Sequence, residues 1–94
     1  MSTKTLSKKV TIQNDQGLHA RPSTLVVETA SQFAAEVTII KDDIVVDGKS
    51  ILGVMGLGAA YGECIEVSTT GPDAAEALAA ITDLVEQGFV TTES

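Results

Sequence analysis

Apolar residues follow two different spacings along this chain, and the change between them restricts the possible folds. Three short segments alternate apolar and polar residues, whereas two longer ones place apolar residues at every third or fourth position. The first spacing is typical of strands with one buried face, and the second of amphipathic helices. Such helices must bury their apolar side against another layer. The pattern therefore predicts an α+β protein, a two-layer sandwich with helices on one face of a sheet whose other face is open to solvent.

The expected elements come in the order strand, helix, strand, strand, short helix, strand, helix. The strands are expected at 9–12, 37–39, 44–46 and 65–68, and the first two helices at 20–33 and 51–55. Ser50 is expected to cap the short helix. Asp73 and Glu76 are expected to form a capping box at the start of the last helix. Gly88 is expected to end that helix.

Length and composition limit the class of protein. With 94 residues, 44% of them hydrophobic, the chain is expected to form a single domain over 1–94, with flexible ends at 1–5 and 90–94. A formal net charge of −7 argues against a nucleic-acid partner. One cysteine, Cys64, and one histidine leave neither an internal disulfide nor a metal set. Because no segment resembles a signal peptide or a membrane span, a cytoplasmic protein without membrane insertion is expected.

The segment Gly17–Ser23, with the sequence GLHARPS, contains the only histidine, His19. Within a helix Pro22 is tolerated only in the first turn, so the imidazole is expected at a helix N-terminus. Such an end offers unpaired backbone N–H groups and partial positive charge, which hold phosphate. Imidazole can also be neutral and nucleophilic near pH 7. We therefore expect His19 to accept and release a phosphoryl group, with the Arg21 guanidinium clamping the phosphate oxygens.

A second motif, GKSILGVMGLG, covers Gly48–Gly58. With both motifs at this separation, the chain resembles the histidine-containing phosphocarrier family, HPr, over nearly its whole length. The resemblance implies the element order βαββαβα, an antiparallel sheet of strand order 1-4-2-3 and three helices on one face. It also implies that His19 receives phosphate on Nδ1 from phosphorylated enzyme I and passes it to enzyme IIA domains for sugar uptake. Such a protein is a carrier rather than an enzyme, needs no cofactor or metal, and is expected to be a monomer.

Ser50 has two compatible interpretations. As an ordinary N-cap it would contribute about 1 kcal/mol to stability. The resemblance implies, in addition, that a dedicated kinase phosphorylates it, which a helix N-terminus tolerates electrostatically. Ser50 is then a regulatory phosphoserine, and the partners include an HPr kinase/phosphorylase and a catabolite-control regulator.

A partner surface is expected around both motifs. Leu52 and Met55, one helical turn apart, are expected to form an exposed apolar patch. Lys49 would add positive charge toward an acidic partner. The residues assigned to this surface are Gly17, Ala20, Pro22, Lys49, Ile51, Leu52 and Met55.

The alternative is a regulatory docking module that acts by protein binding, as a nitrogen-type phosphotransferase component or a catabolite-control effector. In that interpretation Ser50 is the switch and His19 is not used. Two departures from the common family pattern bear on partner identity: Gly56 stands where Ser or Thr is frequent, and Tyr61 is bulky.

Overall fold

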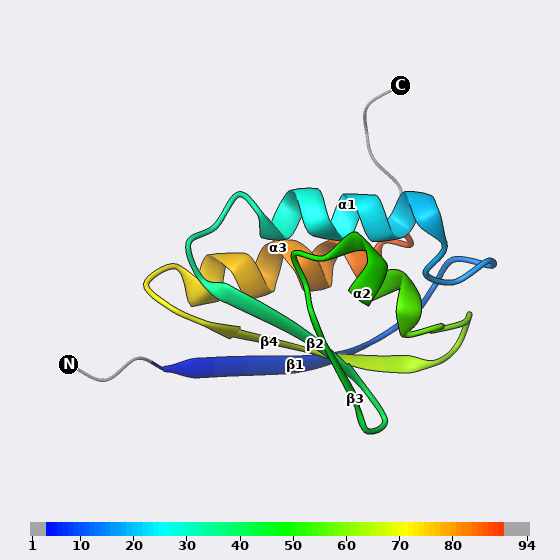
Figure 1. The fold of residues 1–94 in the computed structure, drawn as a ribbon, viewed down its shortest axis with the longest axis horizontal. Helices are drawn as coiled ribbons and strands as arrows, with labels where there is room; N and C mark the ends of the chain where they lie inside the picture. Colours follow the sequence, from blue (N-terminus) through cyan, green and yellow to red (C-terminus); the bar gives the residue numbers. More distant parts are fainter. Residues whose placement is uncertain (1–3, 90–94) are drawn as a thin grey trace.

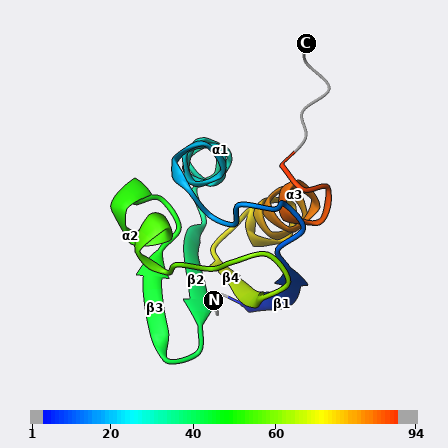
Figure 2. The ribbon, with the colours of Figure 1, turned by 90° about the vertical axis from the view of Figure 1, so that its right-hand side faces the viewer.

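The computed structural model describes residues 4–89. Its elements are β1 (Thr5–Thr11), α1 (Ala20–Ala30), β2 (Glu36–Lys41), β3 (Ile44–Asp47), α2 (Ile51–Gly56), β4 (Cys64–Thr70) and α3 (Ala74–Glu86). The strands form one antiparallel sheet in the order β1-β4-β2-β3. All three helices cover the same face of this sheet (Figures 1 and 2). The expected open-faced α+β sandwich, including its strand order, is confirmed.

The core lies between the sheet and the helices. In the central strand β4, Ile65, Val67 and Thr69 are buried, and the residues between them are half-buried on the open face. Ile65 and Val67 belong to a buried cluster that also includes Val26 of α1 and Ile81 of α3. The period-two pattern at 65–68 therefore identified the strand, which continues to Thr70 because pairing with β1 and β2 extends that far.

The expected flexible ends, 1–5 and 90–94, lie outside the described residues except for Lys4 and Thr5. Thr5 is the first residue of β1 and pairs with Thr70. Within 4–89, no helix has the length and apolar character needed to cross a membrane.

Helix α1 is shorter than expected. The predicted range 20–33 was wrong at its end, because α1 stops at Ala30 and Ser31 is its C-cap. Phe33 lies seven residues, about two helical turns, after Val26, so its spacing matches that of the apolar stripe. Instead it packs in the following loop against a separate buried cluster, Ala35, Ala74 and Ala77.

The predicted capping box of α3 was also wrong. Asp73 occupies the N-cap position but makes no side-chain hydrogen bond to its own helix. Its carboxylate instead accepts hydrogen bonds from the backbone N–H groups of Ala34, at 2.9 Å, and Ala35, at 2.8 Å. Asp73 therefore links the start of α3 to the loop between α1 and β2 instead of capping its own helix.

The end of α3 is confirmed at Gly88. Its N–H donates to the carbonyl of Val85 at 3.0 Å, and the N–H of Phe89 donates to that of Leu84 at 3.0 Å. Gly88 has a φ of +71°, so the two bonds form a Schellman motif. The motif turns the chain so that Phe89 is buried in the main core.

Candidate functional site

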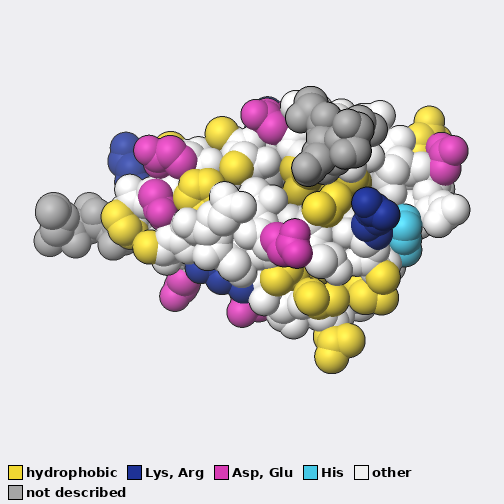
Figure 3. All heavy atoms as spheres, turned by 90° about the horizontal axis from the view of Figure 1, so that it is seen from above, with side chains coloured by type: hydrophobic (Ala, Val, Ile, Leu, Met, Phe, Trp, Pro, Cys, Tyr) yellow, Lys and Arg dark blue, Asp and Glu magenta, His cyan; other side chains and the backbone are white. Residues whose placement is uncertain are grey.

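His19 is exposed and is the N-cap residue of α1, in an extended backbone conformation. Its carbonyl accepts the first helical hydrogen bond, from the N–H of Ser23 at 3.0 Å. Its ring makes no capping bond. Figure 3 shows the histidine at the surface, beside a basic side chain and close to several apolar ones. The imidazole therefore projects into solvent from the start of a helix, as the sequence predicts.

The backbone amides behind His19 are available to a ligand. In the part of the chain that the structure describes, the N–H groups of Ala20 and Arg21 have no hydrogen-bond partner. Pro22 follows as the third helical residue, at a position where an N–H would also lack a helical acceptor. The first turn of α1 thus presents two unpaired donors and the positive end of the helix dipole, an arrangement that suits an anion.

The turn before His19 is held tightly against the loop after α2. Gly17 has a φ of +70°, and a side chain there would collide with the carbonyl of Ala59. The N–H of Leu18 donates to that same carbonyl at 2.9 Å. The Leu18 side chain is buried in the core. Leu18 anchors the turn and leaves the next residue, His19, outside.

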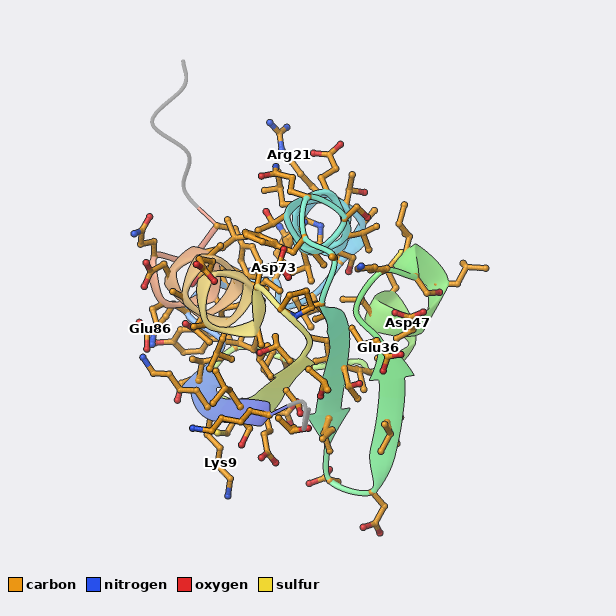
Figure 4. The ribbon with its side chains drawn as sticks, turned by 90° about the vertical axis from the view of Figure 1, so that its left-hand side faces the viewer. Lys9, Arg21, Glu36, Asp47, Asp73 and Glu86 are labelled. Carbon is orange, nitrogen blue, oxygen red and sulfur yellow. The ribbon has the colours of Figure 1, made fainter. Side chains whose placement is uncertain are left out.

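Arg21 lies in the first turn of α1, and its side chain points away from the body of the protein (Figure 4). It forms no ion pair with any described residue, since the three bridges found there involve Lys8 and Lys41. The guanidinium therefore remains free to meet an incoming anion.

A shallow depression in the surface lies between the first turn of α1 and the turn that follows α3. It is lined by Asn14, His19, Arg21, Pro22, Leu25, Gly88 and Phe89. Sequence reasoning missed Asn14, Gly88 and Phe89 as neighbours of the histidine. The last two come from the Schellman turn of α3, and no local signal in the sequence places that turn beside the start of α1.

Ser50 caps α2 as predicted. Its Oγ accepts a hydrogen bond from the N–H of Gly53 at 3.1 Å, and the residue is half-buried. Lys49, next to it, donates from Nζ to the carbonyl of Phe33 at 2.9 Å. The ammonium group that was expected to face a partner is thus engaged inside the fold.

His19 and Ser50 lie at opposite ends of the α1–α2 pair. The residue before Ser50 contacts the loop after α1, through the Lys49–Phe33 bond. The loop after α2 contacts the residue before His19, through the Leu18–Ala59 bond. The two helices therefore run antiparallel.

An apolar surface extends along α2 between these two ends. Ile51, Leu52 and Met55 are 42%, 82% and 37% exposed, whereas Val54 is fully buried. The expected exposure of Leu52 and Met55 is confirmed. Two other members of the predicted partner surface, Gly17 and Pro22, are buried and shape the backbone instead, while Ala20 is exposed.

Residues 4–89 contain no group of three or more His, Cys, Asp and Glu side chains that could hold a metal ion.

Comparisons with known proteins agree with this geometry. The family model described as the PTS HPr component phosphorylation site matches residues 6–87. The phosphocarrier protein HPr of Neisseria meningitidis serogroup B is 50% identical over 84 residues, which cover 89% of this chain and 94% of that protein. The crystal structure of HPr-C-His from Thermoanaerobacter tengcongensis is 42% identical and superposes with a TM-score of 0.86, covering 89% of this chain and 94% of that one. For the phosphocarrier protein HPr of Bacillus anthracis the identity is 41% and the TM-score 0.83, with 86% and 96% covered.

The fold, the site and these relatives define a phosphocarrier of the phosphotransferase system. The chain belongs to the HPr family.

Proposed function

We propose that His19 carries the phosphoryl group, receiving it from phosphorylated enzyme I and passing it to enzyme IIA domains during sugar uptake. The observation that carries this proposal is the exposed imidazole at the N-cap of α1, next to the unpaired amides of Ala20 and Arg21.

In the proposed step the lone pair of the neutral ring nitrogen Nδ1 attacks phosphorus. The bond from phosphorus to the donor breaks as the new P–N bond forms, and the donor keeps the electron pair. Charge spreads over the peripheral phosphate oxygens in a loose transition state, so positioned positive charge stabilises it. The two amides and the Arg21 guanidinium supply that charge, and a planar guanidinium can bridge two oxygens. Transfer to the acceptor is the same step in reverse.

The test is incubation with phosphoenolpyruvate and enzyme I, followed by intact mass measurement and acid treatment. We expect an added phosphoryl group that is lost in acid and is absent from His19→Ala. If the wild-type chain binds its partners but gains no phosphate, the regulatory docking module becomes the better interpretation.

We also propose that Ser50 is a regulatory phosphosite for an HPr kinase/phosphorylase, whose product a catabolite-control regulator recognises. Ser50 supports this by its place at the start of α2, where a phosphate is electrostatically favoured. The test is treatment with a bifunctional HPr kinase/phosphorylase, with Ser50→Asp as the control that keeps an N-cap but has no hydroxyl. An unmodified wild-type chain would remove this part of the proposal.

We propose further that the protein acts as a cytoplasmic, cofactor-free monomer. Sedimentation analysis at micromolar concentration tests the oligomeric state, and a concentration-dependent dimer would contradict it.

A further inference from the structure

The turn that presents His19 is closed by a side chain that neither motif contains. Asn14 follows β1 by three residues, and its Nδ2 donates to the carbonyl oxygen of Gly17 at 2.6 Å. The backbone carbonyl of Asn14 accepts the N–H of Gly17 at 3.1 Å. Residues 14 and 17 are therefore held together twice, once through the main chain and once through the amide side chain.

The Gly17 carbonyl is also the acceptor for His19, whose N–H lies 2.9 Å from it. The Asn14 side chain and the His19 backbone thus bond to one oxygen. A rotation of the peptide plane between Gly17 and Leu18 would weaken both bonds at once. The bond from the His19 N–H to this carbonyl restrains the Leu18–His19 peptide plane, and with it the direction in which the imidazole leaves the backbone.

The other half of the Asn14 amide is unusual. Its Oδ1 is buried and has no hydrogen-bond partner among residues 4–89. Asn14 also lines the depression that holds His19 and Arg21. Burying an acceptor without a donor costs stability, and native proteins rarely do it without another reason. Here the unpaired oxygen is the unavoidable companion of the NH₂ group that holds the Gly17 carbonyl.

We propose that Asn14 is a positioning residue for phosphoryl transfer, which fixes the His19 backbone through their shared acceptor. The inference rests on the proposed role of His19. It predicts an effect on the rate of the chemical step, because small displacements of a reacting group reduce that rate strongly. It predicts little effect on the affinity for enzyme I.

The test compares Asn14→Leu, which removes both amide groups at similar size, with Gln16→Leu in the same loop. Gln16 is exposed and makes no side-chain hydrogen bond to the described residues, so the same change there is a matched control. For Asn14→Leu we expect kcat with enzyme I and phosphoenolpyruvate to fall by about tenfold or more, with KM unchanged. Gln16→Leu is expected to transfer at the wild-type rate.

A second measurement separates positioning from general instability. Amide hydrogen exchange by NMR should speed up at His19 in Asn14→Leu, while the amide of Val67 in the central strand keeps its protection.

If Asn14→Leu folds poorly, Asn14→Asp serves instead, because its carboxylate cannot donate to the Gly17 carbonyl. Equal kcat in the Asn14 variants and the wild type, or a loss of protection equal at His19 and Val67, would overturn the proposal. If the wild-type protein takes no phosphate at all, the role of His19 fails, and faster exchange confined to His19 would still support the backbone restraint.

Discussion

The Nζ atom of Lys49 lies 2.9 Å from the carbonyl oxygen of Phe33. This bond joins the residue before the Ser50 cap to the loop that follows α1. The adjacent backbone N–H groups, of Ala34 and Ala35, bond to Asp73 at the start of α3. One short loop therefore connects the starts of α2 and α3, at the end of the sandwich remote from His19.

Replacing Lys49 with Met keeps the length of the side chain and removes its ammonium donor. We expect Lys49→Met to lower the free energy of unfolding by about 1 kcal/mol, the usual net value of such a hydrogen bond. Urea titration measures the change. Lys9→Met is the control, because Lys9 is exposed and forms no ion pair with the described residues. Equal urea midpoints for Lys49→Met and Lys9→Met would show that water hydrogen-bonds to the Phe33 carbonyl as favourably as the Lys49 ammonium does.

Arg21→Ala should slow phosphoryl transfer by about a hundredfold or more, since one preorganised donor at a reacting anion commonly has that value. The melting temperature should not change, because Arg21 is exposed and pairs with no acid in 4–89. The transfer rate of Arg21→Lys should lie between those of the wild type and Arg21→Ala, because an ammonium cannot bridge two phosphate oxygens. Single-turnover kinetics with phosphorylated enzyme I provide the measurement, and a wild-type rate for Arg21→Ala would refute the clamp.

Ser50→Ala should destabilise the protein by about 1 kcal/mol, because the N–H of Gly53 loses its acceptor. Ser50→Asp should remain close to the wild type, since a carboxylate can accept the same bond. Chemical denaturation of the three proteins in parallel distinguishes them. A stable Ser50→Ala variant would mean that water replaces the cap at no cost.

Gly17→Ala and Gly56→Ala are expected to have opposite effects. At Gly17 the positive φ and the nearby Ala59 carbonyl exclude a side chain, so a loss of at least about 1–2 kcal/mol is expected. At Gly56, within α2, a Cβ would meet nothing within 4 Å. Alanine there should stabilise the helix by up to about 1 kcal/mol. Thermal unfolding of both variants is the check, and a loss of equal size in both would contradict this account of the turn.

The stability of the fold should depend on pH through Asp73. The backbone N–H of Ala34, and then that of Ala35, hold the pKa of the Asp73 carboxyl below its ordinary value, despite an opposing contribution from desolvation. A carboxyl with a lowered pKa in the folded state stabilises the protein fully above its unfolded pKa, near 4. That contribution is lost as pH falls through the lower, folded pKa. Urea midpoints between pH 7 and pH 2 should therefore fall less steeply for Asp73→Asn than for the wild type, whereas Asp43→Asn, in an exposed turn, should follow the wild type.

Local patterns predicted the elements because burial on one face imposes its own period on each strand and helix. These patterns gave wrong predictions where a residue contacts a segment far away in the sequence. Phe33 repeats the spacing of α1 but packs against alanines contributed partly by α3. Asp73 has the spacing of a capping box but accepts its bonds from a loop 38 and 39 residues away.

In the candidate site, too, adjacent residues predicted some features, whereas others depend on tertiary packing. The exposure of His19 and the N-cap role of Ser50 follow from a few adjacent residues, and both were predicted. The strand order came from the family resemblance, since no spacing determines it. The approach of Phe89 to the first turn of α1 depends on how α3 lies across the sheet, and sequence spacing carries no information about that.

The two boundaries of the described chain differ in what can be attached to them. Phe89 lines the depression beside His19, whereas Thr5 pairs with Thr70, just before α3 begins at the opposite end of the sheet. A fluorophore attached at Gly88, which also lines that depression, would lie beside the imidazole and crowd any approaching enzyme. Labels for kinetic work therefore belong near Thr5.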